Sequence, residues 1–170
     1  KGGLPIALGE DTGGNAVVMD LASLPHVLIA GATGSGKSVC INSIVASLLF
    51  TKPPDQLRML MVDPKRVELT PFNGIPHLIA PVIVDVDEVN QALRALMREM
   101  FLRYKLMEEI GTRNISGYNA KSEERMPYLV LIVDELADLM MVGGFEIEQN
   151  LVRLAQLGRA TGIHLVLATQ

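Results

Sequence analysis

The chain has 170 residues, of which 49% are hydrophobic, and a net charge of −4, which together predict one domain with a substantial core. No apolar stretch approaches the roughly 20 residues needed to cross a bilayer, and no apolar signal segment follows Lys1, so we expect a cytoplasmic location. The acidic balance gives no support for nucleic-acid binding through the field of the whole chain, and the single Cys40 excludes an internal disulfide.

The N-terminal segment predicts a β-hairpin followed by the first strand of the core. Leu4–Leu8 and Ala16–Met19 are short strand-like runs on either side of a polar, glycine-rich turn at 9–14. His26–Ala30 is an apolar run between a proline and a glycine, which indicates the first strand of the core.

Residues 31–38 fill the phosphate-loop pattern GxxxxGK[ST] between that strand and a predicted helix at Val39–Phe50. Glycines allow successive backbone N–H groups to converge on a polyphosphate at a helix N-terminus. Lys37 would reach the β- and γ-phosphates of ATP, and the Ser38 hydroxyl would hold Mg²⁺. A loop that merely links strand to helix is the alternative, and the flanking elements disfavour it. The predicted binding residues are Gly31, Ala32, Thr33, Gly34, Ser35, Gly36, Lys37 and Ser38.

The middle of the chain predicts a second strand, the longest helix and a polar loop. Arg58–Val62 is the strand, and Asp63, which precedes a proline, is interpreted as the start of a turn. The helix follows 84–87, with Asp85 or Asp87 as N-cap and Gly111 just past its end. Residues 112–126 are polar, and the charged run Lys121–Arg125 within them is interpreted as a solvated face or loop. The helix carries an apolar stripe that we expect to pack on the sheet: Val86, Val89, Leu93, Met97, Met100, Tyr104 and Met107.

The last third of the chain predicts two further buried strands with a helix between them. Tyr128–Val133 is an unbroken apolar run, as expected for a strand buried on both faces. Phe145–Ala160 is interpreted as a helix that Gly162 stops, and Ile163–Ala168 as the last strand. His164 lies inside that strand and is interpreted as a core residue. The alternation predicts an α/β fold with a mostly parallel sheet and helices on both faces.

Two acids follow the strand at 128–133, where parallel sheets place their ligand sites. Asp134 could reach the metal directly or through its waters, and Glu135 could orient or deprotonate an attacking water. Alternatively, Asp134 caps a turn and Glu135 is an ordinary acid at a helix start. Gln170 ends the last strand and either senses the γ-phosphate or is a plain loop residue.

Several segments together resemble the motor domain of the FtsK/SpoIIIE family of bacterial DNA translocases, and the match runs nearly end to end. The phosphate loop by itself is generic, whereas the segments at Val62–Leu69 and Gly162–Gln170 are specific to this family. The resemblance implies a RecA-like ATPase core, with ATP and Mg²⁺, that forms a hexameric ring around double-stranded DNA and moves it during cell division or sporulation. The segments are Gly31–Ser38, Val62–Leu69, Gly74–Leu78, Val133–Met140 and Gly162–Gln170.

The resemblance also implies roles for single residues. Ser38 and Asp134 would hold the metal, Glu135 would activate water, and Gln170 would sense the γ-phosphate. Arg159 falls where the family places an arginine finger that reaches the nucleotide of a neighbouring subunit. From the sequence alone, Arg159 would equally be a cation at a helix C-terminus.

Members of this family continue past the strand that ends at Gln170 into further strands, pore loops that face DNA and usually a small winged-helix DNA-reading domain. We therefore expect residues 1–170 to be a truncated motor domain of a larger protein that is anchored to the inner membrane by an absent N-terminal segment. The edge of the strand at His26–Ala30 should then be bare or covered in another way.

Two other classes of ATPase resemble the same core, namely type VII secretion (protein export) ATPases and conjugation coupling ATPases. Both remain alternatives to the DNA translocase. A GTPase switch is disfavoured because the segment Asn119-Ala120-Lys121-Ser122 lacks the final acid of a guanine-reading motif.

Overall fold

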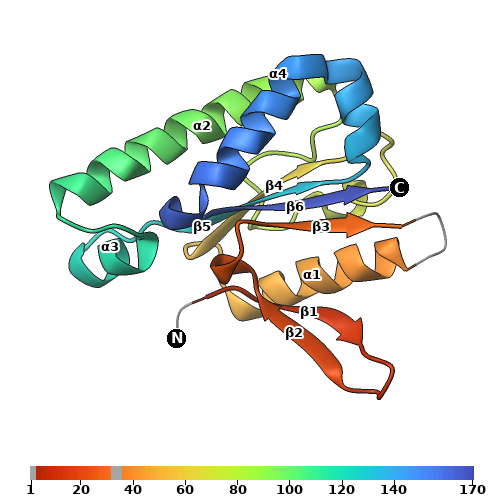
Figure 1. Cartoon of the computed structure of the whole chain (residues 1–170), viewed down its shortest axis with the longest axis horizontal. Coiled ribbons are helices and arrows are strands. Elements are labelled where there is room, and N and C mark those ends of the chain that lie inside the picture. The colour runs from red at the N-terminus through yellow and green to blue at the C-terminus, as the bar shows by residue number, and fades with distance from the viewer. Residues whose placement is uncertain (1–2, 32–35) are drawn as a thin grey trace.

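The computed structural model describes residues 3–31 and 36–170, and within them the strands form two sheets. One is an antiparallel hairpin, and the other is a parallel sheet with the order β3-β6-β5-β4. Figure 1 shows the hairpin apart from the main sheet. The predicted hairpin and parallel sheet are confirmed. The strands are β1 (Pro5–Glu10), β2 (Ala16–Asp20), β3 (His26–Ala30), β4 (Leu57–Val62), β5 (Tyr128–Val133) and β6 (Ile163–Thr169).

Helices cover both faces of the parallel sheet, as the sequence predicted (Figure 1). The helix α1 (Lys37–Thr51) lies on the same face as the hairpin, and α2 (Val86–Glu109) and α4 (Leu136–Leu157) lie on the other. A short α3 (Ile115–Lys121) precedes β5. Among the described residues, no helix has the length and apolar character needed to span a membrane. Three short 3₁₀ turns complete the described elements: η1 (Leu21–Ser23), η2 (Thr70–Phe72) and η3 (Arg159–Thr161).

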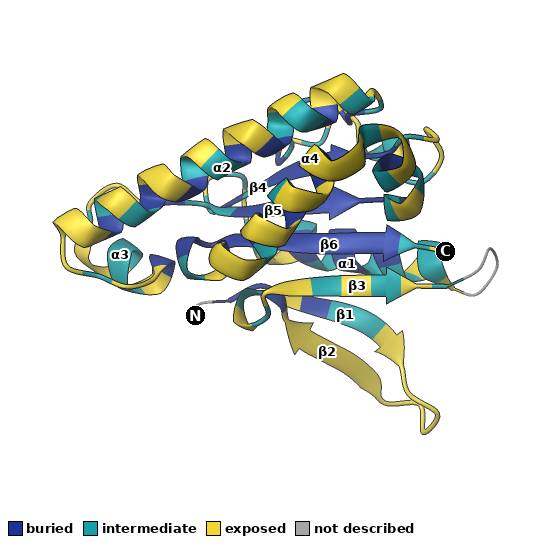
Figure 2. Cartoon of the chain, turned by 45° about the horizontal axis from the view of Figure 1, so that its top comes forward, coloured by how far each residue is buried: buried dark blue, intermediate teal, exposed yellow. Residues whose placement is uncertain are grey.

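The central strands are buried on both sides because successive side chains of a strand point to opposite faces. In β5, Leu131 and Val133 join the core under α2 and α4, whereas Val130 and Ile132 join the core under α1 and the hairpin. Figure 2 shows β4, β5 and β6 as almost continuously buried. The unbroken apolar run therefore correctly predicted that β5 is a strand buried on both faces.

The hairpin is fastened to α1 through β1. The Ser43 hydroxyl donates to the Ala7 carbonyl at 2.6 Å, and the Ala7 N–H donates to the Ser47 hydroxyl at 3.0 Å. The outer strand β2 is exposed along its length (Figure 2). The strand β3 pairs with β6 alone among the described strands, and Leu28 on it is 58% exposed. Of the two outcomes expected for this edge, bare or covered in another way, the described strands leave it without a strand partner.

The long helix α2 begins and ends where its capping residues predicted. The Asp85 carboxylate accepts from the Asp87 N–H at 3.0 Å, and Gly111 lies just past the end with φ 73°. Most of the predicted stripe is buried against the sheet. Arg103 is also buried, which the stripe did not predict, and its Nη1 donates to the Thr161 carbonyl at 2.8 Å.

The polar segment 112–126 contains α3, a helix that the sequence did not predict, in which Ile115 is buried and the Asn114 side chain caps the first turn by accepting from the Gly117 N–H. The charged run interpreted as a solvated face or loop, Lys121–Arg125, lies outside this helix except for Lys121.

One helix boundary was predicted wrongly. The helix expected at 145–160 begins earlier, at Leu136. It is interrupted at Gly144, whose φ of 63° and ψ of −150° are not helical. The prediction from the sequence therefore recovered only the part of α4 that follows this kink.

The substitution Leu93→Ala should lower the free energy of unfolding by about 2–5 kcal/mol, because Leu93 on α2 is 1% exposed and its loss leaves a cavity against the sheet. The matched control is Leu102→Ala on the same helix, where Leu102 is 48% exposed. Urea unfolding of both variants measures the difference. Equal losses would contradict the packing face assigned to α2.

Candidate nucleotide site

Four polar side chains lie where the parallel strands end, at one edge of the sheet. Asp63 follows β4, Asp134 and Glu135 follow β5, and Gln170 follows β6. Lys37 begins α1, the helix that comes after β3. Open α/β sheets bind ligands at this carboxyl edge, so the topology brings the predicted catalytic groups to one place.

The N-terminus of α1 has the features of an anion site. Its N-cap, Gly36, has φ 96° and offers no side-chain cap, so the first N–H groups of the helix lack a side-chain acceptor there. The N–H of Gly31 donates to the Thr169 carbonyl at 3.2 Å, which ties the start of the loop to β6. The predicted binding residues Ala32, Thr33, Gly34 and Ser35 lie outside the described residues.

Lys37 contacts both acids that follow β5. Its ammonium lies 3.0 Å from Asp134 Oδ1 in an ion pair and donates a hydrogen bond to Glu135 Oε1. The side chains are almost fully buried, with exposed fractions of 9% for Lys37, 2% for Asp134 and 9% for Glu135. The strands β3 and β5 are separated by β6, so only the folded sheet brings these groups together.

Burial and charge change the pKa values of this cluster. Burial on its own would lower the pKa of the Lys37 ammonium, but the carboxylates of Glu135 and Asp134 outweigh it and the net pKa is raised. Burial raises the pKa of Asp134, and the charges of Glu135 and Asp63 add to this effect while Lys37 opposes it. Burial is thus the main cause of the raised pKa of Asp134, and the Lys37 ammonium is what favours its charged form.

Glu135 has an unusual backbone. Its φ of 55° and ψ of 58° are left-handed, a conformation that costs a non-glycine residue of order 1–3 kcal/mol. It is the N-cap of α4 but makes no side-chain cap hydrogen bond there. The alternative that Glu135 is an ordinary acid at a helix start does not account for a carboxylate that is directed to Lys37.

A third acid contacts the phosphate-loop helix. The Ser38 hydroxyl donates to Glu68 Oε1 at 2.5 Å. Sequence reasoning did not single out Glu68, although it lies in one of the segments that carried the family resemblance. The loop that carries it starts at Asp63, whose Oδ2 accepts from the N–H groups of Leu69 at 2.9 Å and Thr70 at 3.2 Å. The interpretation of Asp63 as a turn residue is thereby confirmed.

The residues at this edge fit a magnesium ion bound together with a nucleotide. Asp63 is fully buried, and its Oδ1 has no hydrogen-bond partner among the described residues. The described residues contain no group of three or more His, Cys, Asp or Glu side chains that could hold a metal alone. Mg²⁺ is usually held by one or two carboxylates, its waters and the substrate phosphates, for which Ser38 and Asp134 are suitable ligands.

Arg159 lies at the opposite edge of the sheet from this cluster. It opens η3, which joins the end of α4 to the start of β6. The strand β6 has seven residues, so about 23 Å of strand separates Arg159 from Gln170 at 3.3 Å per residue. Arg159 is exposed and therefore accessible to another molecule. The structure thus does not bring Arg159 together with Lys37, Asp134 and Glu135.

His164 is fully buried in β6, as expected of a core residue. Its Nδ1 lies 3.1 Å from the Leu24 carbonyl. Burial lowers the pKa of this imidazole, which keeps it neutral at physiological pH.

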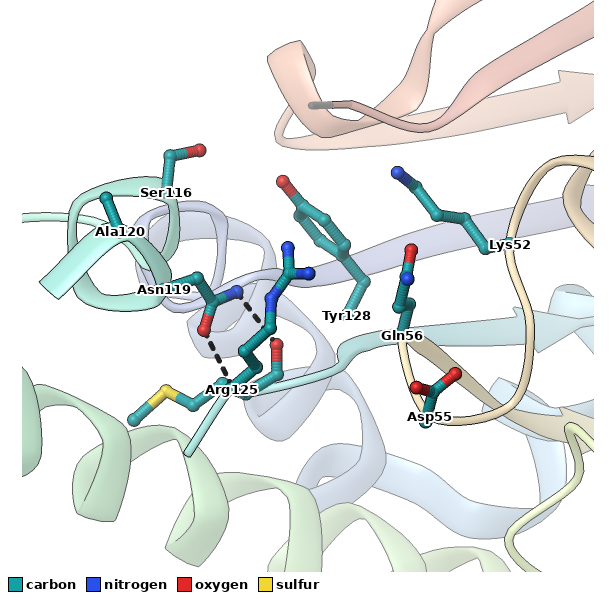
Figure 3. Close-up of a pocket in the computed structure, with 9 residues that line it drawn as sticks. Lys52, Asp55, Gln56, Ser116, Asn119, Ala120, Arg125 and Tyr128 are labelled. Carbon is teal, nitrogen blue, oxygen red and sulfur yellow. Dashed lines mark hydrogen bonds between the residues drawn. The ribbon is translucent and has the colours of Figure 1, made fainter. Parts of the chain in front are cut away.

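A hollow of about 430 Å³ lies at the edge of the sheet where β5 begins, away from the phosphate loop (Figure 3). Lys52, Arg125 and Tyr128 are among the residues that line it. The Asn119 amide there donates to the Met126 carbonyl at 3.0 Å, and its oxygen accepts from the Met126 N–H at 2.7 Å. Asn119 is hydrogen-bonded to the backbone of its own chain at the edge where β5 begins, opposite the carboxyl edge of the sheet. This position further disfavours a guanine-reading role.

Comparisons with known proteins match nearly the whole chain. A sequence model of the FtsK/SpoIIIE family matches residues 1–170. The DNA translocase FtsK of Sporosarcina ureae is 52% identical over 177 residues, covering 98% of this chain and 23% of that protein. This chain thus spans about a quarter of the length of that curated relative.

Solved structures share the fold. The cytoplasmic domain of the Thermomonospora curvata type VII secretion ATPase EccC matches with a TM-score of 0.84 at 28% identity, over 98% of this chain and 21% of that one. The pCW3 conjugation coupling protein TcpA, in its monomer form with ATPγS, matches with a TM-score of 0.74 at 32% identity, over 100% of this chain and 49% of that one. The predicted P-loop ATPase fold is confirmed.

The substitution Lys37→Met should lower the free energy of unfolding of the nucleotide-free protein by about 3–5 kcal/mol at pH 7, because it leaves two buried carboxylates without their cation. Adding Glu135→Gln should restore part of the loss by removing one of those charges. Chemical denaturation measures both variants.

The pH dependence of this effect has a defined sign. Because the pKa of Lys37 is raised in the folded state, its stabilising contribution is complete below the ordinary lysine pKa and is lost as the pH rises through the folded-state value. On the alkaline side, the advantage of wild type over Lys37→Met should therefore persist until the solution is strongly alkaline, and in acid it should shrink as the paired carboxylates are protonated. Equal stability of the two proteins at pH 7 would contradict the ion pairs.

Proposed function

The chain belongs to the FtsK/SpoIIIE family, and we propose that residues 1–170 form the ATPase motor domain of a translocase that moves double-stranded DNA. One observation carries the ATPase assignment, namely the contact of Lys37 with Asp134 at 3.0 Å and with Glu135 across the carboxyl edge of the sheet. The DNA substrate is supported by the name of the Sporosarcina ureae relative.

The residues at the edge divide the work of ATP hydrolysis among them. The N–H groups at the start of α1 bind phosphate oxygens, and Lys37 turns from the carboxylates to the β- and γ-phosphates. Ser38 and Asp134 hold Mg²⁺, which neutralises charge on the phosphates when it is bound. Gln170 faces the same edge from the end of β6 and contacts the γ-phosphate.

Glu135 is the general base of the proposed reaction. Without nucleotide its carboxylate is occupied by the Lys37 ammonium. When Lys37 moves to the phosphates, Glu135 is free to accept a proton from the water that attacks the γ-phosphorus. The left-handed backbone at Glu135 fixes this carboxylate at the end of β5 before substrate arrives.

Arg159 acts on the nucleotide of a neighbouring copy in this proposal. Its distance from Lys37 along the sheet prevents it from serving the site of its own chain, and its exposure suits an interface. Arg103, a buried residue of α2, holds the η3 turn that presents Arg159 by donating to the Thr161 carbonyl. A repeated contact of this head-to-tail kind closes into a ring, for which we propose a hexamer.

Protein export and conjugative transfer remain candidate functions because of two specific likenesses. The EccC structure is that of a type VII secretion ATPase, and TcpA is a conjugation coupling protein. The higher identity to the Sporosarcina ureae translocase favours DNA movement.

Duplex DNA should accelerate ATP hydrolysis by the protein that carries this chain, and the acceleration should weaken steeply between 50 and 200 mM salt, as it does when phosphates of DNA are neutralised. Steady-state phosphate release with and without a DNA duplex measures this effect. A signal peptide of a secreted protein serves as the alternative activator. Acceleration by the peptide and not by DNA would favour export.

Arg159→Ala should reduce turnover by about 10³–10⁵-fold, the range of an arginine finger supplied in trans. Glu135→Gln should bind ATP and turn it over at least 10²-fold more slowly. Mixing the two inactive variants should restore activity, because about a quarter of the interfaces then pair an intact Glu135 with an intact Arg159 of the neighbour. No recovery on mixing would show that Arg159 acts on its own subunit or not at all.

A further inference from the structure

The contact between Ser38 and Glu68 assigns a role to an acid that belongs to neither of the motifs at the site. We infer that Glu68 is a positioning residue for Mg²⁺, holding the Ser38 hydroxyl so that its oxygen faces the metal. This inference rests on the proposed function, because it needs Mg-ATP to bind beside Lys37.

A serine hydroxyl has one proton to donate and two lone pairs that accept or coordinate. When Ser38 ligates a metal, its lone pair serves the metal and its proton needs a separate acceptor. Glu68 Oε1 already accepts that proton at 2.5 Å. Asp134 and Glu135, the other two acids that contact this helix, are engaged by Lys37. The geometry therefore gives Glu68 the task of fixing the rotation of the hydroxyl.

The loop that presents Glu68 is held from both sides. Asp63 Oδ2 accepts from the N–H groups of Leu69 and Thr70, the two residues that follow Glu68. Leu69 is fully buried in the core under α1. Before Glu68 the chain turns at Arg66, whose φ is 60° and whose N–H donates to the Asp63 carbonyl at 3.2 Å. Glu68 therefore reaches Ser38 from an ordered turn.

Charge gives Glu68 a second reason to favour a divalent cation. Around Lys37 the edge holds Asp63, Asp134 and Glu135, whereas the nearby Lys65 pairs with Asp138 at 3.3 Å. Glu68 therefore adds to an excess of negative charge around the Lys37 ammonium. An outer acid of this kind raises metal affinity through the ligand that it orients, and its loss typically costs about 10–100-fold.

Binding of a fluorescent, slowly hydrolysed ATP analogue, measured by anisotropy with Mg²⁺ and again with EDTA, tests this role. Glu68→Ala should weaken binding about 10–100-fold with Mg²⁺ and leave binding in EDTA unchanged. Glu68→Gln, which keeps an acceptor oxygen, should lose less than Glu68→Ala. Glu109→Ala, a change at an exposed acid at the end of α2, is the control and should bind as wild type does.

A double-mutant cycle with Ser38→Ala shows whether Glu68 acts through the hydroxyl. Once Ser38 is replaced, removing Glu68 should cause no further loss of Mg²⁺-dependent affinity. An equal loss in EDTA, additive losses in the cycle, or tighter binding by Glu68→Ala would each overturn the inference. Thermal unfolding without nucleotide identifies a variant whose fold is damaged, and Glu68→Gln then decides. A wild type that binds no analogue in either buffer would overturn the proposed function itself.

Discussion

The contact of Lys37 with Asp134 and Glu135 is the constraint on which the site depends. It joins the first turn of α1 to the end of β5, residues 98 positions apart for the Lys37 and Glu135 pair. Three nearly buried charged groups are costly to remove from water, so the geometry must be held accurately by the rest of the fold. The order β3-β6-β5 does this, because β6 sets the spacing between the loop after β3 and the acids after β5.

The two edges of the parallel sheet therefore carry different tasks. The carboxyl edge gathers the groups suited to phosphate and metal, whereas the amino edge carries Arg159, the α3 helix and the hollow beside Tyr128. The buried Arg103 links the far end of α2 to η3, and so couples the helical layer to the turn that presents Arg159. The proposed action of Arg159 on a neighbouring subunit uses this separation, because Arg159 is exposed at the edge away from the site of its own chain.

The sequence predicted the features that depend on residues close together in the chain. The phosphate-loop pattern has a fixed spacing, and a strand buried on both faces needs an apolar run, so the loop, β5 and the acids after β5 could be predicted from short stretches of sequence. Lys37 and Asp134 contact each other as expected. Glu68 could not be assigned in this way, because its contact with Ser38 spans 30 residues and depends on a turn that Asp63 organises. The helix α3 was missed for a related reason, since Gly117 weakens the helical signal and a single buried residue, Ile115, anchors it.

The same contacts explain why nucleotide and metal should enter this site as one unit. Phosphates can recruit Lys37 only by removing it from Asp134 and Glu135, which would leave two buried carboxylates without a cation. The cost of such an unpaired buried charge is of the order of 3–5 kcal/mol. A divalent cation that arrives with the phosphates replaces the charge that Lys37 withdraws, so metal-free nucleotide would have to bear a cost that Mg-ATP avoids. In the proposed function, the acids that follow β5 would thus act on binding, through charge balance, before either of them takes part in hydrolysis.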